Sequence, residues 1–114
     1  QHQEFPSPWR PILKANADYA LCPTYPSVLF GPTTVNEDQP EGLRLIRETA
    51  AFRCGGRMQT LSWASRHDGA SLWRAAQPKV GLQGNRSPAD ELYVRRIGEA
   101  ADLANVCAAS MGGD

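Results

Sequence analysis

The stretch SPADELYVRRIGEAADLANVCAASM, residues 87–111, decides the fold because it carries the clearest secondary-structure signal in the chain. Ser87 is a good N-cap, Pro88 suits the first helical position, and Asp90 completes a pattern like a capping box. Apolar side chains then recur every three or four residues: Tyr93, Ile97, Ala100, Ala101, Ala104, Ala108 and Met111. The pattern predicts a helix over residues 88–111, ended by glycines at 112–113. Its alanine-rich stripe favours close approach of another element.

Two extended segments precede this helix, at residues 58–63 and 70–75. Asp68 and Gly69 between them are a strong turn signal, so the pair predicts a β-hairpin. Leu72 and Trp73 fall on opposite faces of the second strand, which gives both faces a large apolar group. We expect one of the hairpin tryptophans to be a core residue and the other to face a partner.

The first half of the chain predicts less regular structure. Residues 1–11 are rich in proline, which favours an extended N-terminal arm, and residues 22–40 read as a long loop with a brief strand at 28–30. A short helix is predicted to start near residue 38, with Pro40 in its first turn and Leu43, Ile46 and Ala50 on one face. Residues 49–54 are compatible with an extended end to this helix. Together these elements predict a small α+β domain over residues 12–114, preceded by the arm.

Composition limits the class of protein. The 114 residues suffice for one domain, and 12 basic residues balance 12 acidic ones, which argues against a nucleic-acid or membrane-surface binder. No apolar run is long enough for a membrane span. The chain begins with Gln1, so we expect a secreted product whose signal peptide has been removed. Three cysteines in an oxidising compartment predict one disulfide and one remaining thiol; three buried thiols in a cytosolic fragment are the alternative.

No residue pattern indicates catalysis. His67 lies at the predicted hairpin tip beside Asp68, where neighbouring side chains point apart, and His2 lies on the terminal arm. The acidic residues near the first helix are expected to be helix N-terminal charges rather than a reactive cluster: Glu37, Asp38, Glu41 and Glu48. We therefore predict a protein that is not an enzyme and has no cofactor or metal site. Asn85 begins a glycosylation sequon, but Ser87 within it is also the predicted helix cap.

Five motifs stand in order along residues 12–107, before a helix that carries a third cysteine, Cys107. They are Leu-Cys-Pro at 21–23, QPEGL at 39–43, FRC at 52–54, LSW at 61–63 and ASLW at 70–73. The ordered set resembles glycoprotein L of the alphaherpesviruses, of the varicellovirus type. That resemblance implies a disulfide between Cys22 and Cys54, with Cys107 either in a second bridge or free.

The resemblance also implies a function. Glycoprotein L binds envelope glycoprotein H as a non-covalent heterodimer, chaperones its folding and transport, and regulates membrane fusion by glycoprotein B when the virus enters cells. This chain would then travel the secretory pathway to the virion envelope and host cell surface, held there through glycoprotein H. Exposed apolar side chains would face that partner: Phe5, Trp9, Leu61, Trp63, Leu72, Trp73 and Tyr93.

Two other classes of protein stay open from the residues alone. A bacterial periplasmic inhibitor or immunity protein is also small, secreted and cysteine-bridged, and it would be stable as a monomer. A secreted hydrolase would require an activity that is sensitive to replacement of His67.

Overall fold

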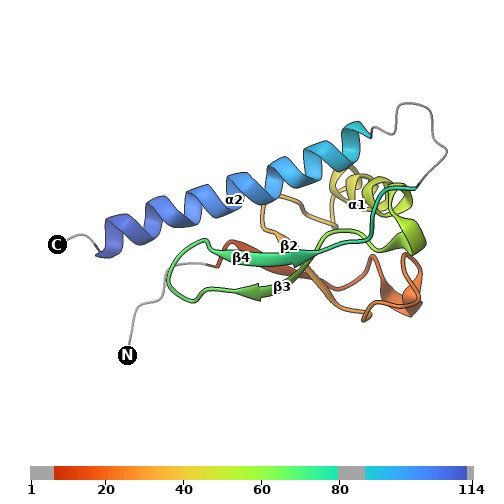
Figure 1. Cartoon of the computed structure of the whole chain (residues 1–114), viewed down its shortest axis with the longest axis horizontal. Coiled ribbons are helices and arrows are strands. Elements are labelled where there is room, and N and C mark those ends of the chain that lie inside the picture. Colours follow the sequence, from red (N-terminus) through yellow and green to blue (C-terminus); the bar gives the residue numbers. More distant parts are fainter. Residues whose placement is uncertain (1–6, 80–86, 113–114) are drawn as a thin grey trace.

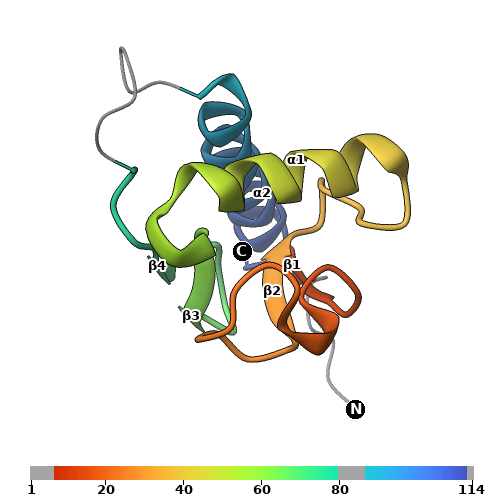
Figure 2. The same cartoon turned by 90° about the vertical axis from the view of Figure 1, so that its right-hand side faces the viewer.

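The long C-terminal helix organises the molecule. The structure, a computed structural model, describes residues 7–79 and 87–112, with side chains as far as Asn105. Helix α2 (Pro88–Gly112) runs along one side, and helix α1 (Pro40–Phe52) lies across its N-terminal part (Figure 1, Figure 2). Two pairs of antiparallel strands lie on the other side of the helices. The predicted α+β class is confirmed at this level.

Helix α2 begins where the sequence predicts. The Ser87 hydroxyl accepts a hydrogen bond from the backbone N–H of Asp90 at 3.2 Å, and Pro88 occupies the first turn. The predicted apolar stripe faces inward, since Tyr93 and Ala100 are 0% and 2% exposed. The Asp90 carboxylate, however, does not serve the helix terminus: it points toward α1.

Helix α1 also starts as predicted but ends later. Pro40 is at its start, and Ile46 and Ala50 form its buried face. Residues 49–52 are helical rather than extended because Thr49 and Phe52 are themselves buried by the packing of α1 on the rest of the chain. The single turn η2 (Cys54–Gly56) follows, and its two glycines have φ values of 67° and 74°, which favour glycine.

The strands form two separate pairs. Strand β1 (Trp9–Ile12) pairs with β2 (Leu29–Pro32), so the predicted brief strand is present, shifted by one or two residues. Strand β3 (Thr60–Ala64) pairs with β4 (Ser71–Arg74), which confirms the predicted hairpin. Figure 2 shows β1 and β2 beside β3 and β4 under the crossing of the two helices.

A bulge decides which hairpin tryptophan faces inward. Leu61 lies opposite Trp73 and Trp63 lies opposite Leu72, so residue 62 is an extra residue in β3. Trp63 is 53% exposed and Leu72 62% exposed. Trp73 instead packs edge-on against Trp9, with ring centroids 5.2 Å apart. Trp73 is therefore the inner tryptophan and Trp63 the outer one.

The tip of this hairpin docks on α2. The backbone N–H of Gly69 donates to the side-chain oxygen of Asn105 at 2.7 Å. A Cβ at Gly69 would collide with the backbone carbonyl of Ala101, so only glycine allows this approach. The alanines predicted to permit close contact lie on this part of α2, and Ala104 is 4% exposed.

The extended arm predicted over residues 1–11 is not shown. Residues 1–6, and Phe5 with them, lie outside the described residues, while Trp9 and the two residues after it belong to β1. Trp9 is 8% exposed and so is a core residue. The division of the chain at residue 12 stays a prediction.

A buried asparagine organises the loop that follows β1. Asn16 is fully buried, and its amide nitrogen donates to the carbonyls of Cys22 (3.2 Å) and Pro26 (2.8 Å). Its side-chain oxygen accepts from the backbone N–H groups of Leu21 (2.9 Å) and Cys22 (2.8 Å). Four hydrogen bonds from one side chain hold this loop without regular secondary structure.

The predicted Cys22–Cys54 disulfide is not formed, which corrects that part of the expected fold. Both residues are free thiols. The Cys22 sulfur lies 3.3 Å from the Thr24 hydroxyl, whereas the Cys54 sulfur points to the carbonyl of Pro78 at 3.8 Å. The two thiols thus contact different segments. The side chain of Cys107 lies outside the described residues.

The core lies between the helices and the strands, and it replaces the disulfide as the source of stability. Its largest fully buried apolar side chains come from α1, α2 and the segment before β3. They pack with residues of β1, β2 and the intervening loop in one cluster: Ile12, Ala15, Cys22, Tyr25, Leu29, Val35, Ile46, Ala50, Met58 and Tyr93.

Candidate functional site

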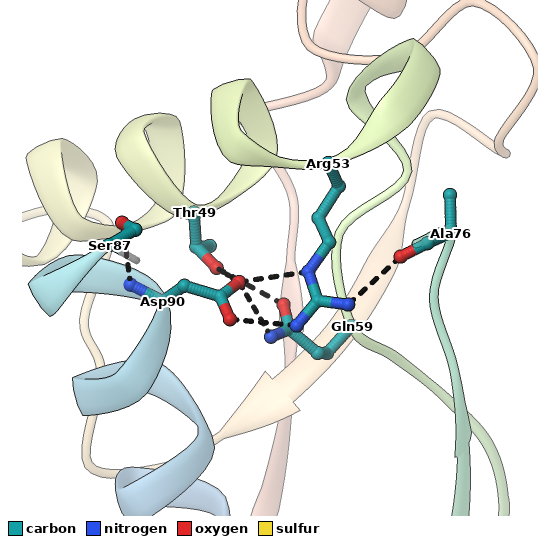
Figure 3. Close-up of polar contacts among 6 residues, drawn as sticks. All are labelled: Thr49, Arg53, Gln59, Ala76, Ser87 and Asp90. Atoms are coloured by element: carbon teal, nitrogen blue, oxygen red, sulfur yellow. Dashed lines mark hydrogen bonds and ion pairs between the residues drawn. The ribbon is translucent and has the colours of Figure 1, made fainter. Parts of the chain in front are cut away.

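The Asp90 carboxylate is the centre of a buried polar group that joins the two helices (Figure 3). One carboxylate oxygen accepts from the Thr49 hydroxyl (2.7 Å), the Gln59 amide (3.0 Å) and Arg53 Nε (3.0 Å). The other accepts from Arg53 Nη2 at 2.7 Å. We call these four residues, Thr49, Arg53, Gln59 and Asp90, the Asp90 cluster.

Each member of the Asp90 cluster comes from a different kind of local structure. Thr49 lies in the last turns of α1, and Arg53 is the residue that ends this helix. Gln59 immediately precedes β3, and Asp90 lies in the first turn of α2. The cluster therefore ties both helices to the hairpin.

The Asp90 cluster is an ionised, fully paired site. Burial alone would raise the pKa of Asp90, but the hydrogen bonds from Arg53, Thr49 and Gln59 outweigh it and lower that pKa below its ordinary value. The side chains of Arg53 and Asp90 are only 16% and 9% exposed. A carboxylate that already accepts four hydrogen bonds has little capacity to bind a substrate or move a proton, so the cluster positions the fold rather than reacts.

Arg53 also reaches the segment after β4. Its Nη1 donates to the Ala76 carbonyl at 2.9 Å, and the Ala76 N–H donates to the Arg57 carbonyl at 3.0 Å. The backbones of residues 52–54 and 77–79 are bonded as well, through Cys54 N–H to Gln77 O and Lys79 N–H to Phe52 O. The buried ion pair thus fixes the strand-like path of residues 76–79.

A second polar group lies directly beyond Ala76. Thr24, Tyr25, Arg57, Arg74, Ala75 and Ala76 line a surface pocket of about 320 Å³. We call it the arginine pocket. Its two guanidinium groups make it the site in the described residues best suited to an anion.

The residues predicted to bind a partner do not form one exposed surface. Trp9 and Tyr93 are buried in the core, and Leu61 and Trp73 are half-buried. Trp63 and Leu72 are exposed neighbours on the hairpin. Phe5 and the sequon residue Asn85 lie outside the described residues.

Neither the described histidine nor the acidic residues near α1 form a reactive site. His67 is exposed at the hairpin tip, and its backbone N–H donates to Ser65. Glu37 accepts the backbone N–H groups of residues 13–15, so it caps that turn rather than α1, and Asp38 pairs with Lys14. Among the described residues, no group of three or more histidine, cysteine or acidic side chains could hold a metal ion. No helix in the same part of the chain is long and apolar enough to cross a membrane.

Sequence reasoning missed the residues that form both polar groups. It assigned Asp90 to a helix cap, and it used Arg53 only as a neighbour of Cys54. It did not consider Arg57 or Arg74. The sequence does contain one indication of such groups, the excess of arginine over lysine, ten to two. Arginine is preferred where a bidentate ion pair or a bound anion is needed.

Comparison with known proteins identifies the family. Residues 1–110 match the family model of the myotubularin-like phosphatase domain. The phosphatidylinositol-3,5-bisphosphate 3-phosphatase MTMR2 of Bos taurus is 38% identical over 89 residues, which are 78% of this chain and 13% of that protein. Myotubularin of Rattus norvegicus is 38% identical over 91 residues, 80% of this chain and 14% of the relative. Myotubularin-related protein 9 of Mus musculus is 35% identical over 88 residues, which are 77% of this chain and 15% of that protein.

These matches overturn the resemblance to glycoprotein L. The order of cysteines and tryptophans on which it rested carries little information, since the cysteines are unpaired and one tryptophan is a surface residue. The inferred partners glycoprotein H and glycoprotein B, the fusion role and the virion location are therefore wrong, as is the expectation of a protein that is not an enzyme. The alternative of a bacterial inhibitor or immunity protein has no support either. The chain spans about one-seventh of the length of the curated relatives it matches, and it belongs to the myotubularin-like phosphatase family.

Proposed function

We propose that this chain is part of a phosphoinositide phosphatase that removes the 3-phosphate of phosphatidylinositol 3,5-bisphosphate. The observation that carries the proposal is the family match over residues 1–110, together with the activity in the name of the MTMR2 relatives. In the reaction, water supplies the oxygen that replaces the inositol 3-oxygen on phosphorus. The bond between phosphorus and the 3-oxygen breaks, giving inorganic phosphate and phosphatidylinositol 5-phosphate.

Within that enzyme we assign the described residues of this chain a scaffold role and not the attacking group. A cysteine nucleophile needs a thiolate, an accessible position and a base or cation beside it. Cys22 is fully buried next to a threonine hydroxyl, and Cys54 contacts a backbone carbonyl. Asp90 is held by four hydrogen bonds. These contacts support a chain whose polar groups fix the positions of helices and strands.

The activity is tested with the complete product of the gene that encodes this chain. We expect release of inorganic phosphate from a soluble short-chain phosphatidylinositol 3,5-bisphosphate, and phosphatidylinositol 5-phosphate as the lipid product. Phosphatidylinositol 4-phosphate, which has no 3-phosphate, is the matched control and should release none. A folded protein that releases no phosphate from the bisphosphate, or that cleaves the 4-phosphate equally well, would contradict the proposal.

The scaffold role is tested in the same protein. Asp90→Ala should lower the thermal unfolding temperature and the fraction of active enzyme together, because it removes a structural tie. Asp38→Ala, which breaks the exposed pair with Lys14, is the control and should change neither. An Asp90→Ala enzyme that is as stable as the parent but has lost its turnover would instead place Asp90 in the chemistry.

A further inference from the structure

The arginine pocket presents two cations on a fixed backbone. Arg57 is held by three hydrogen bonds: its Nε donates to the Thr24 hydroxyl at 2.9 Å, its N–H donates to Cys54, and its carbonyl accepts from Ala76. Neither terminal nitrogen of its guanidinium donates a hydrogen bond to another described residue. Because the side chain and backbone are already ordered, binding an anion there costs less conformational entropy than at a free surface arginine.

Arg74, the second arginine of the pocket, is held by an aromatic ring. Its guanidinium carbon lies 5.4 Å from the centroid of the Tyr25 ring, within the range of a cation–π contact. The ring is itself fixed, since Tyr25 is 6% exposed and its hydroxyl donates to the Met58 carbonyl at 3.1 Å. A guanidinium stacked in this way keeps its edge N–H groups free for an acceptor.

No carboxylate of the described residues neutralises the pocket. Its lining contains no acidic residue, and neither Arg57 nor Arg74 forms an ion pair with a carboxylate of the described residues. Positive charges also act on Tyr25. Burial raises the pKa of its hydroxyl, and the charges of Arg74, Arg57 and Arg53 oppose that rise. Arg57 and Arg74 thus concentrate positive charge here in a chain whose net charge is zero, while the charge of Arg53 is paired with Asp90.

The rest of the lining leaves space at the two cations. Ala75 and Ala76 contribute only methyl groups, and the hydroxyls of Thr24 and Tyr25 already hydrogen-bond to Arg57 and Met58. Ala76 is fixed by Arg53, so the floor of the pocket is tied to the buried Asp90 cluster. A small tetrahedral oxyanion in this pocket therefore has both arginines in its lining.

We propose that the arginine pocket binds a phosphate monoester through Arg57 and Arg74. A phosphate dianion suits two guanidinium groups because it offers several strong acceptor oxygens and twice the charge of a carboxylate. Inorganic phosphate and the phosphate of an inositol lipid headgroup share this chemistry. Affinity for the anion does not require that the protein be a phosphatase, so failure of one proposal leaves the other standing.

Binding is measured by titrating the 114-residue chain and following its arginine Nε–H signals by nuclear magnetic resonance. The probes are inorganic phosphate, a soluble short-chain phosphatidylinositol 3,5-bisphosphate, and acetate as a singly charged carboxylate. We expect both phosphates to shift the Arg57 and Arg74 signals at concentrations at least about tenfold below those at which acetate does. A lower dissociation constant for the lipid headgroup than for inorganic phosphate identifies the lipid as the source, and the reverse order identifies free phosphate.

Substitutions distinguish binding in the arginine pocket from attraction of the anion to any surface arginine. Arg57→Gln and Arg74→Gln should each weaken phosphate binding about tenfold or more, as expected for loss of a charged hydrogen-bonding partner. Arg66→Gln removes the same charge from an exposed position at the hairpin tip and should leave the dissociation constant unchanged. The circular dichroism spectrum and unfolding temperature of each variant show whether it is folded.

Two results would overturn the proposal. One is phosphate binding by folded Arg57→Gln and Arg74→Gln variants as tight as that of the parent chain. The other is an equal loss in Arg66→Gln, which would mean that the chain attracts anions through its overall cations and not through this pocket. If both pocket variants fail to fold, Arg57→Lys keeps the charge but loses the planar fork, and binding as tight as the parent's overturns the proposal.

Discussion

The guanidinium of Arg53 holds both carboxylate oxygens of Asp90, through Nε at 3.0 Å and Nη2 at 2.7 Å, across the junction of α1 and α2. The two residues are 37 positions apart in the chain, and no regular sequence pattern links them. Their pairing fixes the end of one helix against the start of the other. The stability of this junction and its pH dependence follow from it.

Removing one partner of this pair is expected to be costly. Asp90→Ala leaves the Arg53 charge largely buried without its acceptor, and we expect it to lower the free energy of unfolding by about 3 kcal/mol. The measurement is urea-induced unfolding followed by circular dichroism. Asp38→Ala disrupts an ion pair whose side chains are 71% and 55% exposed, and it should leave the unfolding midpoint unchanged. Similar losses in both variants would refute the distinction between the two pairs.

The same pair gives stability a defined pH dependence. The pKa of Asp90 is lower in the folded chain than its ordinary value of 3.8, so its stabilising effect is complete above that value and is lost as the pH falls through the folded pKa. The difference in unfolding free energy between the parent chain and Asp90→Asn should be constant near neutral pH and shrink in acid below pH 3.8. A difference that grows on acidification would show that the sign is wrong.

Two glycines provide a matched test of the contact between the hairpin and α2. Gly69→Ala puts a methyl group against the backbone carbonyl of Ala101 and should destabilise the chain by about 1–3 kcal/mol. Gly98→Ala places the same methyl group in open space on an exposed part of α2, where better helix propensity should stabilise by about 1 kcal/mol. Thermal unfolding of both variants measures the two effects. Equal shifts in the same direction would contradict the docking of the hairpin tip.

Two tyrosines distinguish a satisfied hydroxyl from an unsatisfied one. The Tyr25 hydroxyl donates to Met58, whereas the buried Tyr93 hydroxyl has no hydrogen-bond partner among the described residues. Tyr25→Phe should therefore cost about 1 kcal/mol of unfolding free energy, and Tyr93→Phe should cost nothing or stabilise. Denaturant unfolding of the two variants tests this, and a larger loss for Tyr93→Phe would show that its hydroxyl is paired.

Local patterns predicted the secondary structure of this chain well. The cap at Ser87 and the proline at the start of α1 are properties of a few neighbouring residues, and the turn signal of the hairpin is likewise local. Each of these local patterns therefore predicts the element in which it lies. The later end of α1 was missed because burial of Thr49 and Phe52 depends on packing with distant segments.

The polar sites could not be predicted for the same reason. The spacing between Ser87 and Asp90 correctly predicted the helix start. The Asp90 carboxylate, however, accepts a hydrogen bond from Arg53, the residue that ends α1. The four bonds of Asn16 depend on a loop whose path has no periodicity. The wrong family followed from weighting cysteines as a disulfide framework when they are free thiols.

The backbone of Ala76 has a consequence for how this domain responds to ligands. Its carbonyl accepts from Arg53 and its N–H donates to Arg57, so the buried pair and the surface pocket are linked through the two adjoining peptide groups of one residue. Occupancy of the pocket and cooperative folding then belong to a single thermodynamic cycle, in which a ligand that binds only the native state raises the melting temperature. Substitutions at Arg53 and Arg57 should accordingly be non-additive, and epistasis between interior and surface becomes a built-in property of this fold.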